Sequence, residues 1–264
     1  MSPYRVLPIV PDVLVCAGLD PSGGAGLIAD VRVLSEHGCR PVGVITALTI
    51  QNTTGVVGTQ ALDPEHLGDQ LQFLLSDIEV KAVKLGMIGS SQIGRSISRA
   101  LDLTNAPVVW DPIMYPSRGD VALGDSMFGE SVAILRSHVT VVTPNARELA
   151  ILSRKPIDSL ADALAAGTAL AHQLGVAVLV KGGHLGGDES IDVLIHRGGS
   201  ETMRAARVPE GHHVHGTGCA LASAIAAHLA HGRDLVDACR SAKEYVAARI
   251  ANPARPGRGA PAVV

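Results

Sequence analysis

The chain has 264 residues, of which 47% are hydrophobic and 18% are charged, and its net charge is −3 with histidine neutral. A chain of this length and composition can bury a large core, which excludes an intrinsically disordered protein. Aromatic residues make up only 2% of the chain. With neither an aromatic platform nor a basic excess, nucleic-acid binding is not expected.

The first residues do not resemble a signal peptide, because Pro8 and Pro11 interrupt the apolar stretch. No later stretch reaches about 18 uncharged apolar residues, so we expect no membrane contact. The four cysteines form no Cys-x-x-Cys pair: Cys16, Cys39, Cys219 and Cys239. We therefore expect free thiols in a cytoplasmic protein.

Short apolar runs alternate with helical patterns along the chain. The predicted strands lie at 13–17, 43–48, 83–85, 108–110, 139–142 and 177–180. The predicted helices lie at 27–34, 64–76, 92–101, 127–135, 160–174, 220–229 and 235–251. The strands are continuous apolar runs, which is typical of a parallel sheet that is covered by helices on both faces.

This rhythm predicts an α/β fold, a three-layer α/β/α sandwich with a mostly parallel central sheet. Two β-like runs within 191–208 flank Gly198-Gly199 and predict a β-hairpin at the sheet edge. We expect a single domain over 1–264 with a core of about 13–251. The N-terminus is expected to be flexible, and 252–264, rich in Pro, Gly and Arg, is expected to be a surface tail.

A first glycine-rich loop runs from Gly18 to Gly26, between a predicted strand and a helix. Within it, residues 24–29 match the dinucleotide pattern G-x-G-x-x-G/A. A Rossmann fold also requires an acidic residue at the end of the second strand to hold the ribose. No acid occurs in 43–52, which disfavours a nicotinamide oxidoreductase. A turn that lets strand and helix pack closely is the plainer interpretation.

A second glycine-rich segment, residues 215–219, reads His-Gly-Thr-Gly-Cys and precedes an Ala-rich helix. Such a helix N-terminus can bind an anion through its first N–H groups. We expect the same N-terminus to lower the pKa of the Cys219 thiol. The alternative is a helix-entry turn in which Cys219 is a small buried hydrophobe. The chain contains no Gly-Lys dipeptide, which excludes a Walker P-loop.

Three polar clusters follow predicted strands: Asp111, residues 143–148 and Lys181. Because ligands in open α/β sheets bind beyond the carboxyl ends of strands, we expect the clusters to converge on one crevice. Carboxylates, a lysine and a helix N-terminus suit a magnesium-bound nucleotide. Taken alone, each cluster can be a strand-ending turn, and Asn145 can be a helix N-cap.

Three histidines lie close together at His212, His213 and His215. They lack the spaced Cys, His or acidic partners of a transition-metal site. A loop that lines an active site explains them better.

Seven segments, taken together, resemble the hydroxymethylpyrimidine/phosphomethylpyrimidine kinases of thiamin biosynthesis, within the ribokinase-like superfamily. They follow in that family's order: residues 17–26, 46–53, 84–87, 111–114, 143–148, 181–184 and 215–219. The resemblance extends from about Val13 to Ala251. It implies a ribokinase-like fold and ATP-dependent, Mg²⁺-dependent phosphorylation of 4-amino-5-hydroxymethyl-2-methylpyrimidine and then of its monophosphate. We also expect a homodimer.

The resemblance also implies roles for individual residues. Substrate-pocket positions are Gly18, Asp30, Gln51 and Met87. The anion hole corresponds to Gly216, Thr217, Gly218 and Cys219, with Cys219 at the position of the catalytic base. ATP contacts correspond to Asn145, Lys181, Thr217 and Gly218, and magnesium contacts, directly or through water, to Asp111 and Glu148. The Gln51 amide suits an aminopyrimidine because it offers both a donor and an acceptor.

The segment after Asp111 departs from the family pattern. Relatives commonly read Asp-Pro-Val-Met-Val-Ala-Lys-Ser-Gly, whereas this chain has Ser117 in place of the usual lysine and Arg118 beside it. A guanidinium is a planar fork and not a point charge, so its grip on phosphate differs. The alternatives are a pyridoxal kinase of the same superfamily and a non-catalytic pyrimidine-binding protein.

Overall fold

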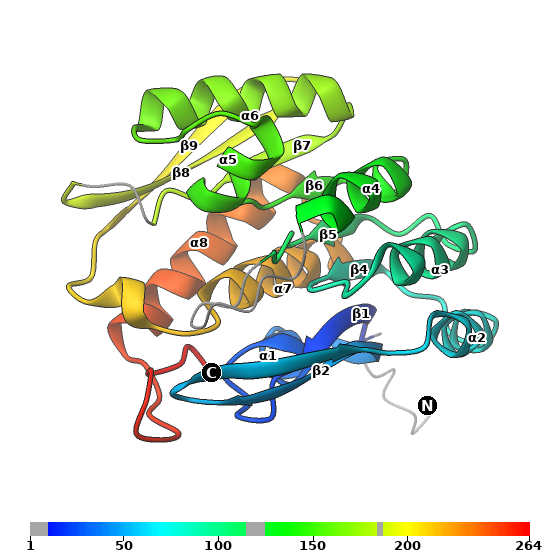
Figure 1. Ribbon diagram of the computed structural model, residues 1–264. Coiled ribbons are helices and arrows are strands. Elements are labelled where there is room, and N and C mark those ends of the chain that lie inside the picture. Colours follow the sequence, from blue (N-terminus) through cyan, green and yellow to red (C-terminus); the bar gives the residue numbers. More distant parts are fainter. Residues whose placement is uncertain (1–9, 115–124, 184–186) are drawn as a thin grey trace, which may run out of the picture.

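The computed structural model describes residues 10–114, 125–183 and 187–264 (Figure 1). The described strands form a nine-stranded sheet in the order β3-β2-β1-β4-β5-β6-β7-β8-β9. Their bounds are β1 Asp12–Leu19, β2 Arg40–Asn52, β3 Gly55–Ala61, β4 Ala82–Leu85, β5 Val108–Trp110, β6 Val141–Val142, β7 Ala177–Val180, β8 Glu189–His196 and β9 Gly199–Ala206. The six central strands, in the spatial order β2-β1-β4-β5-β6-β7, pair in parallel. β3 and the β8–β9 hairpin add antiparallel strands at the two edges.

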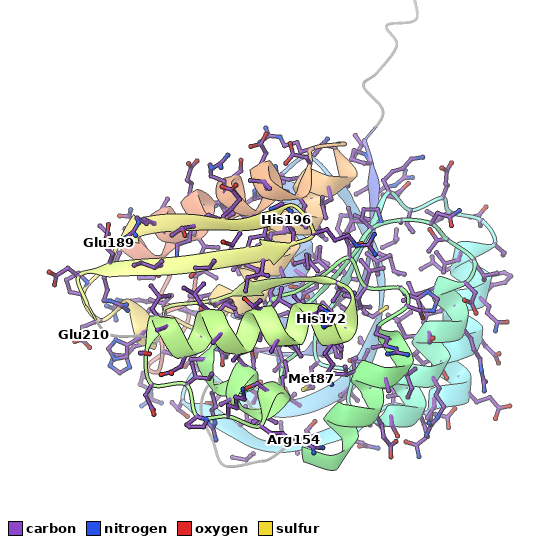
Figure 2. The ribbon with its side chains drawn as sticks, turned by 90° about the horizontal axis from the view of Figure 1, so that it is seen from above. Met87, Arg154, His172, Glu189, His196 and Glu210 are labelled. Carbon is purple, nitrogen blue, oxygen red and sulfur yellow. The ribbon has the colours of Figure 1, made fainter. Side chains whose placement is uncertain are left out.

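Helices cover both faces of this sheet. Their bounds are α1 Gly26–Glu36, α2 Pro64–Leu75, α3 Ser91–Leu101, α4 Asp125–Leu135, α5 Ala146–Ser153, α6 Leu160–Leu174, α7 Thr217–Ala230 and α8 Leu235–Ala251. Helices α1, α7 and α8 pack together on one face, and α2 to α4 lie side by side on the other (Figure 1). Viewed from above, the β8–β9 hairpin lies between α6 and α8 (Figure 2).

Strand β1 shows why the central strands are apolar throughout. Val13, Val15 and Ala17 belong to the core beneath α1, α7 and α8. Leu14 and Cys16, which point the opposite way in a strand, belong to the core beneath α2 and α3. Burial on both faces removes any polar alternation. The predicted three-layer α/β/α sandwich with its edge hairpin is confirmed.

The sequence interpretation missed β3 and α5. The outer half of β2 and all of β3 are only partly buried or exposed, so they present no continuous apolar run. Helix α5 has only 8 residues, too few for a clear helical period. Both elements nevertheless contribute residues to the cavity described below.

The expectation of a surface tail at 252–264 is wrong for its last residues. Ala260, Ala262 and Val263 are buried, and we call residues 260–263 the C-terminal strap. The strap is held through the backbone: Ala260 N–H donates to the Thr53 carbonyl at 2.8 Å. A Cβ on Gly259 would lie 1.9 Å from the Thr53 oxygen. The glycines that suggested a loose tail are therefore required by a close approach of two backbones.

The four cysteine thiols are free, as expected, and all four are buried. Among the described residues, no helix is both long and apolar enough to cross a membrane. The N-terminal residues 1–9, whose flexibility is expected from the sequence, lie outside the described part of the chain. A single domain over the whole chain stays a prediction.

Candidate active site

A cavity of about 800 Å³ lies at the carboxyl ends of the parallel strands. The residues that the sequence nominated line it with one exception: Gly18, Gln51, Met87, Asp111, Asn145, Glu148, Lys181, Gly216, Thr217, Gly218 and Cys219. The exception is Asp30, which is fully buried behind the cavity wall. The predicted convergence of the strand-end clusters on one crevice is thus what the structure shows.

The first glycine loop is folded around the carboxylate of Asp20. This carboxylate accepts hydrogen bonds from the Ser22 N–H at 2.8 Å, the Ser22 hydroxyl at 2.7 Å and the Ala25 N–H at 3.1 Å. Burial acts to raise the pKa of Asp20, but the hydrogen bonds from His215 and Ser22 outweigh it, and the pKa lies below its usual value. Asp20 is therefore an ionised anchor for the loop.

Gln51 and Met87 form one end of the cavity. Met87 packs against Gly18 so closely that a Cβ there would lie 2.5 Å from the Met87 methyl group. The amide of Gln51, on β2, lies 3.2 Å from His215 Nε2 and 3.2 Å from the Thr49 hydroxyl. This end therefore combines an apolar contact with a polar amide, as a small heteroaromatic ring requires.

The N-terminus of α7 lies in the middle of the cavity. Gly216, its N-cap, has φ +82°, and a Cβ there would lie 1.9 Å from the Gly24 carbonyl oxygen. A side chain at position 216 is excluded both by conformation and by space. The N–H groups of the first turn have no acceptor within their own helix, so they are available to an anion.

Two charged groups flank this helix N-terminus. A Cβ on Gly218 would lie 3.1 Å from Lys181 Nζ and 3.2 Å from Asp111 Oδ2. Lys181 Nζ donates to Asp111 Oδ1 at 2.7 Å and lies 3.8 Å from Glu148 Oε2. Burial alone would lower the pKa of Lys181, but Asp111 and Glu148 raise it above its usual value. Lys181 is therefore a permanent cation beside the anion hole.

Glu148 and Asn145 form a capping box at the start of α5. Glu148 accepts from the Asn145 N–H at 2.8 Å, and the Asn145 side chain accepts from the Glu148 N–H at 2.9 Å. The helix-cap interpretation of Asn145 is thus correct, and it also fixes the carboxylate of Glu148 at the cavity. Burial raises the pKa of Glu148, and Asp111 adds to the rise while Lys181 opposes it.

Asp111 and Glu148 suit a magnesium ion by their chemistry. Mg²⁺ prefers oxygen ligands and keeps several of its waters, binding through one or two carboxylates and substrate phosphates. Asp111 uses Oδ1 for Lys181 and Thr143 and turns Oδ2 toward Gly218 in the first turn of α7. Two carboxylates at the anion hole therefore fit an ion that arrives with a nucleotide.

The expected low pKa of Cys219 is wrong for this structure. Cys219 is 5% exposed, and burial raises the pKa of its thiol to about 12. Lys84 and a hydrogen bond from the Gly26 backbone lower this pKa, but Asp30 and Asp111 raise it further. Burial, the largest of these causes, outweighs the groups that lower this pKa.

Lys84 is a charged residue of the cavity wall that the sequence analysis did not assign to the site. It lies on β4, lines the cavity, and has a fully buried ammonium group that donates to Asp30 Oδ2 at 2.5 Å. Ser223 of α7 donates to the other oxygen of Asp30 at 2.8 Å. Burial acts to lower the pKa of Lys84, but Asp30, Cys219 and Asp111 raise it. Two signs were available: a lysine inside an apolar strand, and the position of Lys84 in the segment 84–87 that carries the family resemblance.

The other end of the cavity is mostly apolar and was also missed. It is lined by Val208, Val246 and Ile250. A buried pair borders it, in which Lys243 Nζ lies 2.9 Å from Asp192 Oδ2. Asp192 in turn accepts from the Gly182 N–H at 2.9 Å and so ties this end to the Lys181 loop. These residues are far apart in sequence, so no motif reveals them.

The three clustered histidines separate in space. His215 points inward to Asp20 Oδ2 at 3.1 Å. His212 and His213 are exposed beside Glu210, and ligand atoms of these three residues lie within 4.8 Å of one another. Glu210 lies at the same end of the hairpin as Glu189, away from His196 (Figure 2). Ser117, Arg118 and His184 lie outside the described residues.

Comparisons with known proteins agree with this geometry. The family model described as phosphomethylpyrimidine kinase matches residues 20–263. A hydroxymethylpyrimidine/phosphomethylpyrimidine kinase of Streptomyces coelicolor is 38% identical over 244 residues, covering 92% of this chain and 90% of the relative. The protein of that description from Escherichia coli K12 is 35% identical over 246 residues, covering 91% of each.

Solved structures show the same fold. A pyridoxal kinase from Staphylococcus aureus in complex with ADP has a TM-score of 0.88 and 28% identity, covering 97% of this chain and 93% of the other. A phosphomethylpyrimidine kinase from Clostridium difficile 630 has a TM-score of 0.77 and 31% identity, covering 92% of this chain and all of the other.

The fold and the site together define a small-molecule kinase of the ribokinase-like class. Within that class, the chain belongs to the phosphomethylpyrimidine kinase family.

The buried Lys84–Asp30 pair yields a stability prediction. Lys84→Met and Asp30→Asn should each destabilise the fold by about 3–5 kcal/mol, because each leaves one buried charge without its partner. The double variant should lose less than the sum of the two, since it buries neither charge alone. Urea unfolding of the four proteins measures this, and additive losses would show that the two groups are not coupled.

Proposed function

We propose that the protein transfers the γ-phosphoryl group of ATP to 4-amino-5-hydroxymethyl-2-methylpyrimidine and then to its monophosphate. One observation carries this proposal. The α7 N-terminus, flanked by Lys181 and Asp111, lies between a polar recess at Gln51 and an apolar end at Val208 within one cavity. A kinase needs this order, with acceptor and nucleotide meeting at a site for the transferred group.

The recess at Gln51 is the place of the pyrimidine. Met87 and Gly18 offer a flat apolar contact to the ring, and the Gln51 amide offers a donor and an acceptor to its polar edge. The choice of pyrimidine is supported by the relatives, which are hydroxymethylpyrimidine/phosphomethylpyrimidine kinases.

The apolar end, lined by Val208, Val246 and Ile250, is the place of the purine of ATP. From there the phosphate chain reaches the first turn of α7, where Lys181 and the free N–H groups of Thr217 and Gly218 bind it. Because phosphoryl transfer passes through a loose transition state, aligning these groups supplies most of the catalysis.

Asp111 and Glu148 would hold Mg²⁺, which neutralises charge on the nucleotide phosphates when it is bound. Lys84 places a second cation behind the anion hole, and its ion pair with Asp30 keeps that charge in position. Asp30 thus lies behind the pocket and acts on it through Lys84. The substrate hydroxyl forms its bond to phosphorus as ADP leaves, and the thiolate form of Cys219 takes the hydroxyl proton.

Phosphorylation of pyridoxal is the second candidate, and the likeness to pyridoxal kinases favours it. A non-catalytic pyrimidine carrier would have no use for buried cations around an anion hole. We further propose a cytoplasmic homodimer. Its support is the outer face of the β2–β3 hairpin, where Leu48, Ile50 and Val57 are exposed.

The function is tested by incubating the protein with ATP, Mg²⁺ and either the hydroxymethyl pyrimidine or pyridoxal at equal concentration. We expect the mono- and diphosphate of the pyrimidine, identified by mass. The monophosphate alone would contradict the second step. Faster turnover of pyridoxal would make the second candidate the main activity.

Gly218→Ala tests the anion hole. Its new Cβ would lie between Lys181 and Asp111 and displace the transferring group. We expect kcat to fall about 10²-fold, the usual effect of a misplacement near 1 Å, while pyrimidine binding without ATP is retained. Gly68→Ala in α2, where a Cβ makes an ordinary 3.5 Å contact with Ser96, is the control. Normal turnover by the Gly218 variant would show that residues 216–219 are only a helix-entry turn.

The raised pKa of Cys219 predicts the pH profile. Only the thiolate can accept a proton, and with a pKa of about 12 the thiolate fraction increases about tenfold per pH unit through the neutral range. We therefore expect kcat to rise with pH up to at least about pH 9. Cys219→Ala should be slower by about 10²–10⁴-fold and, above about pH 8, where Glu148 with its pKa of about 7 is already ionised, independent of pH. A matching pH slope in the Ala variant would assign the proton transfer to another group.

A further inference from the structure

The side chain of His215 joins the glycine loop to the pyrimidine recess. Its Nε2 lies 3.1 Å from Asp20 Oδ2 and 3.2 Å from the terminal nitrogen of the Gln51 amide. One ring nitrogen thus faces two polar partners at hydrogen-bond distance. Because a ring nitrogen either donates or accepts, the identity of these partners decides which it does.

The Asp20 partner fixes the proton on His215. An ionised carboxylate can only accept, and Asp20 also accepts from Ser22 and Ala25. His215 Nε2 must therefore carry a hydrogen, whether the ring is neutral or charged. A bare nitrogen there would face the lone pairs of the carboxylate.

This proton in turn decides the orientation of Gln51. An N–H group cannot accept from the amide nitrogen, so the amide must turn its oxygen to His215. A half-turn of the amide exchanges its two ends without moving any other group. The amide nitrogen then faces the Thr49 hydroxyl at 3.2 Å. Thr49 can accept from it, because the Thr49 hydrogen is already donated to the Leu19 carbonyl at 2.8 Å.

The backbone of His215 is fixed as firmly as its side chain. His215 N–H donates to the Pro261 carbonyl at 2.7 Å, and its carbonyl accepts from the Val263 N–H at 3.2 Å, so the C-terminal strap holds it from behind. The ring also lies against Gly24, where a Cβ would be 2.9 Å from His215 Cδ2. The donor that faces Gln51 therefore has little freedom to move.

We propose that His215 is a specificity-determining residue, which orients the Gln51 amide so that the recess selects an aminopyrimidine over a pyrimidinone. This rests on the proposed function of the recess. With its oxygen on the His215 side, the amide accepts from an exocyclic amine and donates to the neighbouring ring nitrogen. A 4-oxo ring presents the reverse order, a carbonyl oxygen beside a ring N–H. Its acceptor would then face the amide oxygen and its donor would face the amide N–H.

The test compares the binding of two ligands in the absence of ATP. They are 4-amino-5-hydroxymethyl-2-methylpyrimidine and the analogue whose amino group is replaced by oxo, and calorimetry gives both Kd values. In the wild-type protein we expect the amino compound to bind more tightly by at least about 10²-fold. His215→Leu frees the amide to turn, so this ratio should fall about 10- to 100-fold, with the oxo analogue binding more tightly than before.

Two further variants keep the test decisive. Thr49→Val removes the acceptor on the other side of the amide and should also lower the ratio of the two Kd values. This variant provides the test if His215→Leu does not fold. Ser22→Ala removes a different hydrogen bond to Asp20 and leaves His215 in place, so its ratio should stay at the wild-type value.

A merely structural role for His215 would weaken both ligands and leave their ratio unchanged, which overturns the inference. It is also overturned if Ser22→Ala lowers the ratio as much as His215→Leu does, or if the wild-type protein binds neither pyrimidine. If the protein discriminates between the two compounds in binding but phosphorylates neither, the proposed kinase activity is contradicted, whereas the proposed role of His215 still holds.

Discussion

The backbone of Gly216 lies against the carbonyl of Gly24, and the whole site depends on this contact. A Cβ at Gly216 would be 1.9 Å from that oxygen, so only glycine lets the N-terminus of α7 reach the first glycine loop. The two segments are almost two hundred residues apart in sequence. Their contact places the N-terminus of α7 directly beside the recess at Gln51, which is the proximity that the proposed phosphoryl transfer requires.

A second constraint is the balance of charge around that contact. Lys84 is fully buried and Lys181 is 13% exposed, and each is paired with a carboxylate, Asp30 or Asp111. Pairing lets two cations stay charged where water is excluded, at the cost of ordering both partners. Within the wall formed by these pairs, the thiol of Cys219 is left neutral by burial. The site is thus built to stabilise an incoming polyanion more than to hold a free thiolate.

The sequence predicted those features that have a local origin. The two-sided apolar strands, the glycine turns and the strand-end polar groups are short patterns, and the fold and most cavity residues follow from them. What failed depended on distant neighbours. In the sequence, Lys84 is an unexplained charge inside a strand. Only the fold shows that Asp30 pairs with it and that Ser223 holds Asp30. The pKa of Cys219 was inferred from its helix alone, whereas burial by the rest of the protein decides it.

The C-terminal strap shows the same limit most clearly. Residues 252–264 have the composition of a loose tail, because Gly, Pro and Arg predominate. Yet backbone bonds tie the strap to Thr53 at the β2–β3 turn and to His215 before α7. These two segments adjoin the recess at Gln51 and the N-terminus of α7, respectively. The strap therefore fixes the relative position of these two segments from the backbone side, and the contact between Gln51 and His215 joins them through their side chains.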